Sequence, residues 1–253
     1  MANERQERAA RAEQMRKERE KADRKQRNLI SIAIVTVVIA LIAVGGYAVK
    51  SANDKNKTNT ELIAPKNVNA DYGFVYDAEA AGGEAGKNPV KVILTEDFQC
   101  PACLSFEQQS SVFLNDLVKK GEITIEYRPI SFLDGSSANE YSSRALNAAL
   151  CVLDKGGIEK YKIMHDLLYA NQPDEGTAGP DDAALIETAK AAGVTGIDSC
   201  VISKRFGPWI EDAYEKLADD GFKGTPWVRI GGKDVKAPTP AGLQQAIDAA
   251  KKA

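Results

Sequence analysis

Two cysteines separated by two residues lie where a predicted strand meets a predicted helix. The run Val90–Leu94 is apolar apart from Lys91, which predicts a strand buried on both faces. The motif Cys100-Pro101-Ala102-Cys103 follows it, and apolar residues then recur at helical spacing up to about Lys120. Ile123–Ile130 alternates between apolar and polar residues, as a strand does. The segment therefore predicts a strand–helix–strand unit with two thiols at its first junction.

A Cys-x-x-Cys motif at the start of a helix favours redox chemistry. The first sulfur faces unpaired N–H groups and the positive end of the helix dipole, and both lower the pKa of Cys100. Cys103 lies one turn further along, where its thiol can resolve a mixed disulfide. Pro101 suits the first helical position, because its missing N–H would have no partner there.

Three alternative roles for the motif have less support. Half of a zinc site needs further ligands, but the chain has no second Cys-x-x-Cys motif and a single histidine. A purely structural disulfide across two residues gains little unfolded-state entropy. Chance placement does not account for a strand before the motif and an amphipathic helix after it. The motif therefore predicts a redox-active pair.

A charge-free run at residues 29–49 predicts a membrane span. It is rich in Ile, Val, Ala and Leu, and as a helix it would be about 31 Å long, close to the thickness of the hydrocarbon core. The run is too long for a typical signal peptide, and no convincing cleavage site follows it. Residues 1–28 hold ten Lys and Arg against six Asp and Glu. By the positive-inside rule we expect a cytoplasmic tail at 1–28, a signal anchor at 29–49 and the rest of the chain outside the cytoplasm.

The remaining chain separates into a linker and one globular domain. Residues 50–70 are rich in Asn, Lys and Thr with little apolar content, which is typical of a linker. Globular patterning starts at residue 71, so the domain is expected at 71–253. The net charge of −3 for the whole chain does not favour nucleic-acid binding.

All four cysteines lie beyond the predicted span, which fits an oxidising compartment. Four thiols allow three pairings. The spacing favours Cys100 with Cys103, which leaves Cys151 and Cys200 for each other.

The rest of the domain is predicted to contain a helical block, two strands and a last helix, giving an α/β fold. Helices are expected at 137–155, 157–171, 181–193 and 198–220. Strands are expected at 72–76, at an edge, and at 227–230 and 233–236. Thr239-Pro240 should cap and begin the last helix.

Four segments of the domain resemble the DsbA-like thiol–disulfide oxidoreductases. They are Asp97–Cys103, Ala148–Cys151, Tyr161–Gln172 and Gly224-Thr225-Pro226. The similarity extends over about residues 71–253 and is greatest to membrane-anchored versions from Gram-positive and actinobacterial envelopes. The resemblance implies a thioredoxin fold with a helical insertion at about 137–220, preceded here by the single transmembrane helix.

The resemblance also implies roles for individual residues. The Thr225–Pro226 peptide bond should be cis, with the backbone before the proline pairing with an extended substrate beside the cysteines. Cys151 and Cys200 should form a structural disulfide within the insertion; the alternative is a shuttle pair that relays electrons to the active site. Many relatives carry His where this chain has Ala102, which adds no charge or hydrogen bond to the first thiolate. We therefore expect an oxidant somewhat weaker than DsbA itself.

These features predict a membrane-anchored, extracytoplasmic enzyme that introduces disulfides into reduced secreted or envelope proteins. The chemistry requires no cofactor, and the family implies re-oxidation by a quinone-linked membrane partner. One alternative is a tethered thiol reductase, for instance in cytochrome c maturation. Another is a non-catalytic thioredoxin-fold binding or chaperone module that uses the groove at Pro226.

Four other side chains have more than one possible role. His165, the only histidine, could tune a nearby thiol, but a packed or surface histidine is favoured. Trp227 could line the substrate groove or belong to the core. Glu96 and Asp97 could modulate the cysteine pKa or serve proton transfer, although Asp97 could simply organise the turn into the helix.

Overall fold

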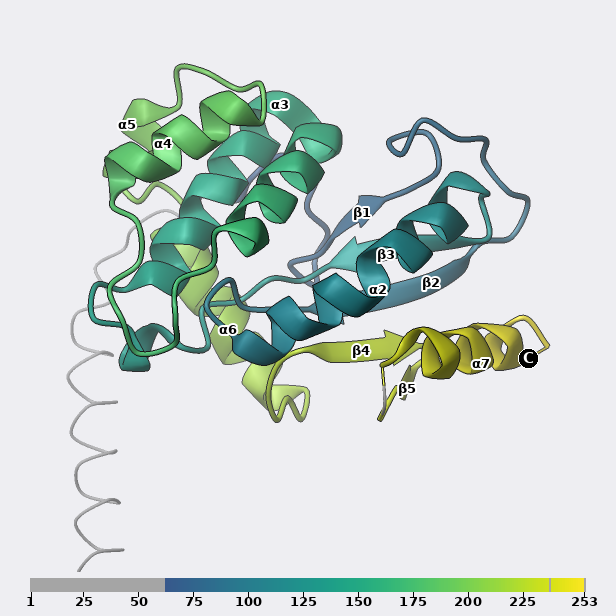
Figure 1. The fold of residues 1–253 in the computed structure, drawn as a ribbon. Helices are drawn as coiled ribbons and strands as arrows, with labels where there is room; N and C mark the ends of the chain where they lie inside the picture. Colours follow the sequence, from purple (N-terminus) through teal and green to yellow (C-terminus); the bar gives the residue numbers. More distant parts are fainter. Residues whose placement is uncertain (1–61, 237, 253) are drawn as a thin grey trace, which may run out of the picture. The chain divides into compact units, whose positions relative to one another are not determined.

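The structure, a computed structural model, describes residues 62–236 and 238–252. Its centre is a five-stranded sheet with the order β1-β3-β2-β4-β5 (Figure 1). The strands are β1 (Phe74–Tyr76), β2 (Val90–Thr95), β3 (Ile123–Tyr127), β4 (Trp227–Ile230) and β5 (Lys233–Asp234). β2 and β3 run parallel, and the other neighbouring strands run antiparallel. The predicted α/β class is confirmed, with β1 at an edge as expected.

The predicted strand–helix–strand unit forms the middle of the sheet. Helix α2 (Pro101–Lys119) connects the central strand β2 to its parallel neighbour β3. β3 ends earlier than the predicted residue 130, because Pro129 has no N–H to continue the ladder. The backbone N–H groups of Arg128 and Ile130 still donate to carbonyls at the end of β2 and just beyond it. The chain therefore stays beside the cysteine motif after the strand has ended.

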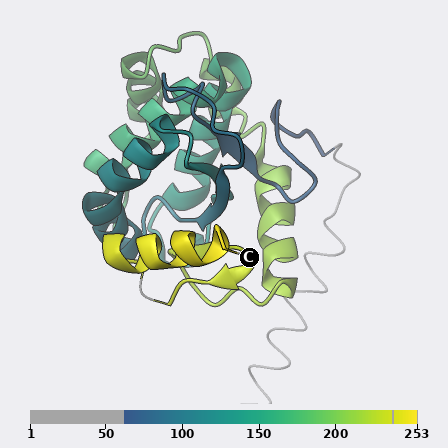
Figure 2. The same cartoon turned by 90° about the vertical axis from the view of Figure 1, so that its right-hand side faces the viewer.

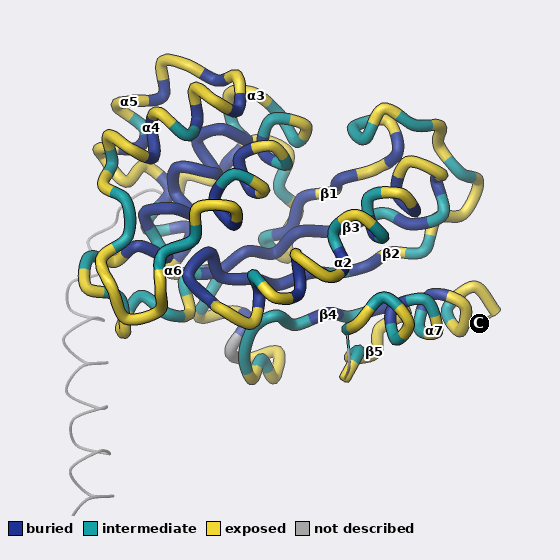
Figure 3. Tube along the Cα trace, in the orientation of Figure 1, coloured by how far each residue is buried: buried dark blue, intermediate teal, exposed yellow. Residues whose placement is uncertain are grey.

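Helices cover both sides of the sheet. On one side α2 contacts the last helix, α7 (Pro240–Ala250), and on the other side lies α6 (Gly207–Asp219), as Figure 2 shows. The Thr239 hydroxyl accepts a hydrogen bond from a backbone N–H in the first turn of α7, so the predicted cap is confirmed. With helices on both sides, the strands are largely buried (Figure 3). Fully buried core residues include Val92, Leu94, Ile123, Val228, Leu243 and Ile247.

A helical block lies between β3 and β4, within the predicted insertion at 137–220. It contains α3 (Tyr141–Ala170), α4 (Asp182–Ala191), α5 (Asp198–Ile202) and α6, and the short 3-10 helix η1 (Asp134–Ser136) precedes it. Gly157 has non-helical dihedral angles and divides α3 at the predicted place. The single helix predicted at 198–220 is wrong. The chain breaks after α5, and Pro208, which lacks an N–H, fits the first turn of a new helix.

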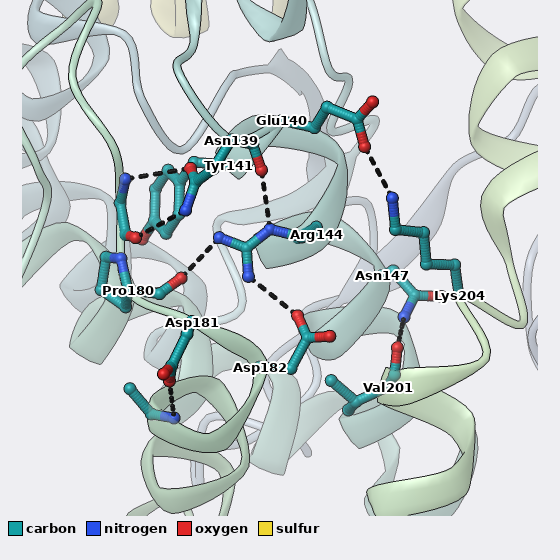
Figure 4. A network of polar contacts seen from close by, with 12 residues as sticks. Asn139, Glu140, Tyr141, Arg144, Asn147, Pro180, Asp181, Asp182, Val201 and Lys204 are labelled. Atoms are coloured by element: carbon teal, nitrogen blue, oxygen red, sulfur yellow. Dashed lines mark hydrogen bonds and ion pairs between the residues drawn. The ribbon is translucent and has the colours of Figure 1, made fainter.

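A buried arginine holds the insertion together (Figure 4). Arg144 of α3 donates hydrogen bonds to the carbonyl oxygens of Asn139 and Pro180, at 2.8 and 2.6 Å, and to the Asp182 carboxylate at 2.8 Å. The neighbouring Asp181 caps α4, because its carboxylate accepts a hydrogen bond from a backbone N–H in the first turn. These bonds fix the segment that leads from α3 to α4.

The packed part of the chain begins before residue 71. Pro65 is buried, Val68 packs against the core, and the backbone N–H of Lys66 donates to the Asp154 carboxylate at 3.0 Å. The predicted linker at 50–70 is therefore too long at its C-terminal end, because its few apolar residues pack on the domain.

Two of the predicted regions lie outside the described residues. They are the cytoplasmic tail at 1–28 and the transmembrane anchor at 29–49, together with the linker up to residue 61. In the part of the chain that the structure describes, no helix has both the length and the apolarity needed to cross a membrane.

Candidate active site

Asp97 organises the turn that delivers the cysteine motif to the helix. Its carboxylate accepts hydrogen bonds from the backbone N–H of Gln99 at 2.7 Å and of Leu133 at 2.8 Å, and from the Ser142 hydroxyl at 2.7 Å. These donors come from the turn itself, from the segment after β3 and from α3. Burial nevertheless raises the pKa of Asp97 to about 6, against the effect of these hydrogen bonds. The role of turn organiser that the sequence suggested for Asp97 is thus confirmed.

Two glutamines, for which the sequence predicted no role, fasten the same turn to the insertion. The Gln99 amide donates to the carbonyl oxygens of Asp174 and Thr177, at 3.1 and 3.0 Å. The Gln172 amide donates to the carbonyl oxygens of Phe98 and of the first cysteine, both at 3.1 Å. Gln172 lies inside one of the segments that resemble DsbA-like proteins, which is the only sequence signal that pointed to it.

Cys100 is the residue before the first turn of α2, and Pro101 begins the helix as predicted. Both Cys100 and Cys103 are thiols in this structure; Cys100 is 7% exposed and Cys103 is fully buried. A hydrogen bond with the Cys103 thiol lowers the pKa of Cys100 to about 6, with further help from Thr225 and from backbone N–H groups at the helix start, and against the effect of burial. A large fraction of Cys100 is therefore thiolate at neutral pH.

The segment before β4 completes the site from the other end of the chain. The Cys100 sulfur lies 3.5 Å from the carbonyl oxygen of Thr225, 125 residues away in sequence. The Thr225–Pro226 peptide bond is cis, as the resemblance implied. The Thr225 hydroxyl is buried and has no hydrogen-bond partner among the described residues, so it can donate to a Cys100 thiolate. The structure thus brings Cys100, Cys103 and Thr225 together.

Comparison with known proteins identifies the family. A family model described as thioredoxin matches residues 81–249, about two thirds of the chain. The chain belongs to the thioredoxin family. DsbA of Mycobacterium tuberculosis, in its reduced form, is 32% identical, with a TM-score of 0.61 over 72% of this chain and 93% of that protein. The disulfide-bond oxidoreductase DsbG of the same organism is 34% identical, with a TM-score of 0.59 over 68% and 84%. The chain is therefore a DsbA-like protein of the thioredoxin superfamily.

A much longer protein, a kinase, contains a region that is similar to this chain. The serine/threonine-protein kinase PknE of Mycobacterium tuberculosis is 28% identical over 169 residues, which are 63% of this chain and 30% of the kinase. The chain thus spans less than a third of the length of that relative.

The second cysteine of the DsbA-like motif lies in a different environment from the first. Burial raises the pKa of Cys103 far above its ordinary range, and the hydrogen bond with Cys100 and the charge of Glu96 act in the same direction. Glu96 follows β2 and is itself buried, and burial together with the charge of Glu107 raises its pKa. The two thiols therefore divide into a largely ionised sulfur, on a residue that is 7% exposed, and a protonated sulfur on a fully buried residue.

His165 is a packed residue, which is the role that the sequence favoured. It is 1% exposed on α3, and its ring lies 4.9–6.0 Å from four aromatic rings, those of Phe98, Tyr127, Tyr161 and Tyr169. Its Nε2 lies 3.2 Å from a Glu96 oxygen, and its Nδ1 lies 3.2 Å from the Asp166 carboxylate. Burial would lower the pKa of His165, but these two hydrogen bonds raise it above the ordinary value.

Cys151 and Cys200 form a disulfide in the DsbA-like domain, joining α3 to α5. Cys151 is buried in α3, and the bond closes a loop of 49 residues. Both cysteines belong to the helical insertion, whereas the thiol pair lies at the start of α2. The disulfide is thus part of the insertion and not of the cysteine motif.

Trp227 lies at the surface beside Pro226, half-buried, and not in the core. Its ring begins a chain of aromatic contacts with centroids 5.4–6.4 Å apart, formed with Phe222, Tyr214 and Phe132. Phe132 is 39% exposed and precedes Leu133, whose N–H binds the Asp97 carboxylate. The aromatic contacts therefore join the segment that binds Asp97 through Leu133 to the segment that approaches Cys100 through Thr225.

Proposed function

We propose that this chain is an extracytoplasmic, membrane-anchored oxidase that introduces disulfides into secreted or envelope proteins through Cys100 and Cys103. The general enzyme class, thiol–disulfide oxidoreductase, rests on the family and on the similarity to DsbA and DsbG. One observation supports the more specific proposal of an oxidase. The Cys100 sulfur lies at the start of α2 and 3.5 Å from the Thr225 carbonyl oxygen, in surroundings that favour its thiolate.

The proposed cycle begins with Cys100 and Cys103 joined by a disulfide. A substrate thiolate attacks the Cys100 sulfur, a mixed disulfide forms, and Cys103 leaves as a thiolate that takes up a proton. A second substrate thiolate then attacks the substrate sulfur of the mixed disulfide, and Cys100 leaves as a thiolate. The substrate gains a disulfide and loses two electrons, which remain in the reduced cysteine pair.

The stabilised thiolate supports the oxidising direction. A low pKa makes Cys100 a good leaving group in the second step. The same stabilisation favours the reduced protein over its disulfide, and a pair whose reduced form is stable takes electrons from its substrates. Cys103 is buried and stays protonated, so the reduced form is stabilised through the Cys100 thiolate alone.

The substrate is proposed to bind as an extended peptide beside the backbone of Thr225. Residues before β4 have backbone groups next to the Cys100 sulfur, as the short distance to the Thr225 carbonyl indicates. The half-exposed aromatic chain of Phe132, Tyr214, Phe222 and Trp227 offers apolar surface for side chains near the reacting cysteine. Unfolded substrate proteins expose apolar side chains that could bind this surface, whereas folded proteins bury them.

The membrane anchor and the re-oxidising partner are supported by the sequence. The charge-free run at 29–49, with its excess of basic residues on the N-terminal side, favours an anchor with the DsbA-like domain outside the cytoplasm. A quinone-linked membrane protein as the electron acceptor follows from the family resemblance. Such a partner would take two electrons from the reduced pair and restore the disulfide.

Trapping of mixed disulfides tests this function. A Cys103→Ala variant of the full chain lacks the second thiol that could resolve a mixed disulfide at Cys100. It should therefore accumulate covalent complexes with its substrates in the cell. We expect many secreted or envelope proteins in these complexes, identified by mass spectrometry after non-reducing separation. A single cytochrome-type client would instead indicate a reductase. A Cys100→Ser variant that fully complements a deletion strain would indicate a binding module and contradict any redox role.

A further inference from the structure

A buried cluster of three potential metal ligands lies outside the thiol pair. Glu96 follows β2, Glu107 belongs to α2 and His165 belongs to α3, and all three residues are buried. One ligand atom from each lies within 4.8 Å of the other two. The end of β2, helix α2 and helix α3 therefore direct an imidazole and two carboxylates to one point.

We propose that Glu96, Glu107 and His165 form a zinc site that ties the helical insertion to the sheet and to α2. Zinc binds imidazole nitrogen and carboxylate oxygen at about 2.0–2.2 Å, so two ligands of a tetrahedral site are about 3.3 Å apart. The His165 Nε2 and the Glu96 Oε2 are 3.2 Å apart. Zinc would replace this hydrogen bond without a large movement of either side chain, and two carboxylates would match the charge of the ion.

The orientation of His165 is the second observation that points to a metal. Its Nε2 faces the cluster, while its other ring nitrogen, Nδ1, lies 3.2 Å from the Asp166 carboxylate. Histidines that bind metal ions commonly donate the second ring N–H to a carboxylate, which fixes the ring and raises its basicity. Asp166 is thus in the place of such an outer partner.

Glu96 supplies a third, independent observation. Its Oε1 is buried and accepts no hydrogen bond from an N–H or hydroxyl group of the described residues. A buried carboxylate oxygen without a partner is costly, and such an oxygen usually binds an ion or an ordered water. Coordination of zinc by the Glu96 carboxylate would satisfy it.

An opening to solvent lies next to the cluster. A surface pocket of about 280 Å³ between α2 and α3 is lined by Glu107, Asp166 and Tyr169, among other residues. Tyr169 also contacts the His165 ring, with centroids 4.9 Å apart. The pocket gives an ion a route to Glu107 and leaves room for a water as the fourth ligand.

Zinc titration of the oxidised, tag-free full chain in neutral detergent tests the proposal. With Cys100–Cys103 and Cys151–Cys200 both as disulfides, none of the four cysteines can bind the ion. Isothermal calorimetry should give one tightly bound zinc per chain, and zinc should raise the midpoint of thermal unfolding, because it binds only the folded state. Failure of this test leaves the proposed redox function intact, since that function is measured by thiol oxidation.

Three matched variants decide whether the zinc lies in this cluster. Glu107→Gln removes one ligand and should abolish both the binding and the thermal shift, whereas Asp166→Asn should weaken binding about 10–100-fold. Glu159→Gln changes an exposed acid of α3 and should bind like the unmodified chain. If Glu107→Gln does not fold, the Asp166→Asn variant alone tests whether the zinc lies in this cluster. Absence of zinc binding, or equal binding by the folded cluster variants, would overturn the proposal.

Discussion

Removal of the Cys151–Cys200 disulfide should destabilise the domain strongly and leave its chemistry intact. In the chain-entropy model, a bond that closes a loop of 49 residues removes about 14 cal/mol/K from the unfolded ensemble, or about 4 kcal/mol at 25 °C. The loss of the buried Cys151 sulfur adds up to about 1 kcal/mol. A Cys151→Ala/Cys200→Ala variant should therefore unfold at a temperature about 10–15 °C lower, given the size of the domain.

Urea unfolding and substrate oxidation, measured on the same preparations, separate a structural bond from a relay. The free energy of unfolding should fall by the amount above, while the rate of disulfide transfer to a dithiol peptide at 25 °C should stay within about twofold, because the bond belongs to the insertion. A Cys100→Ala/Cys103→Ala variant is the matched control: it should lose turnover but keep most of the stability. If the Cys151/Cys200 variant is as stable as the unmodified chain but no longer turns over, the structural interpretation is refuted.

Four further predictions concern single groups. The rate of Cys100 alkylation should rise with pH to a midpoint near pH 6 and then level off, because the thiolate is the reactive form; a midpoint above about pH 8 would contradict the site described here. Thr225→Val removes a hydroxyl that favours the thiolate, so it should move this midpoint upwards. Arg144→Met should lower the free energy of unfolding by about 2–4 kcal/mol in urea, since two carbonyls and a carboxylate lose their donor, and Arg144→Lys should restore part of the loss. Asp97→Asn should cost about 1–3 kcal/mol, because an amide N–H would then face a donor, whereas Ser142→Ala should cost less. An unchanged urea midpoint for Arg144→Met or Asp97→Asn would show that these bonds contribute little.

Local patterns in the sequence predicted the strand–helix–strand unit well. Apolar runs define β2 and α2 directly, and Pro101 marks the start of the helix because of its missing N–H. The pairing of Cys151 with Cys200 could also be inferred, since the other two cysteines are only three residues apart. The break between α5 and α6 was missed, although the pair Gly207-Pro208 is a turn signal at the start of α6.

The polar surroundings of the thiols could not be predicted in the same way. The amides of Gln99 and Gln172 reach carbonyl groups more than 70 residues away, and such partners have no periodic signature. Glu96 and His165 lie 69 residues apart and meet only because α3 packs beside the end of β2. Long-range hydrogen bonds of this kind depend on how the insertion docks on the sheet, which local propensity does not encode.

The reduction potential of the Cys100–Cys103 pair tests the proposed direction of electron flow most directly. It can be measured by equilibrating the full chain with glutathione redox buffers and quantifying the free Cys100 thiol. A stabilised Cys100 thiolate in an oxidase weaker than DsbA predicts a value between about −120 and −250 mV, above that of thioredoxin at about −270 mV. A value below about −250 mV would contradict the oxidase and make the domain a reductase.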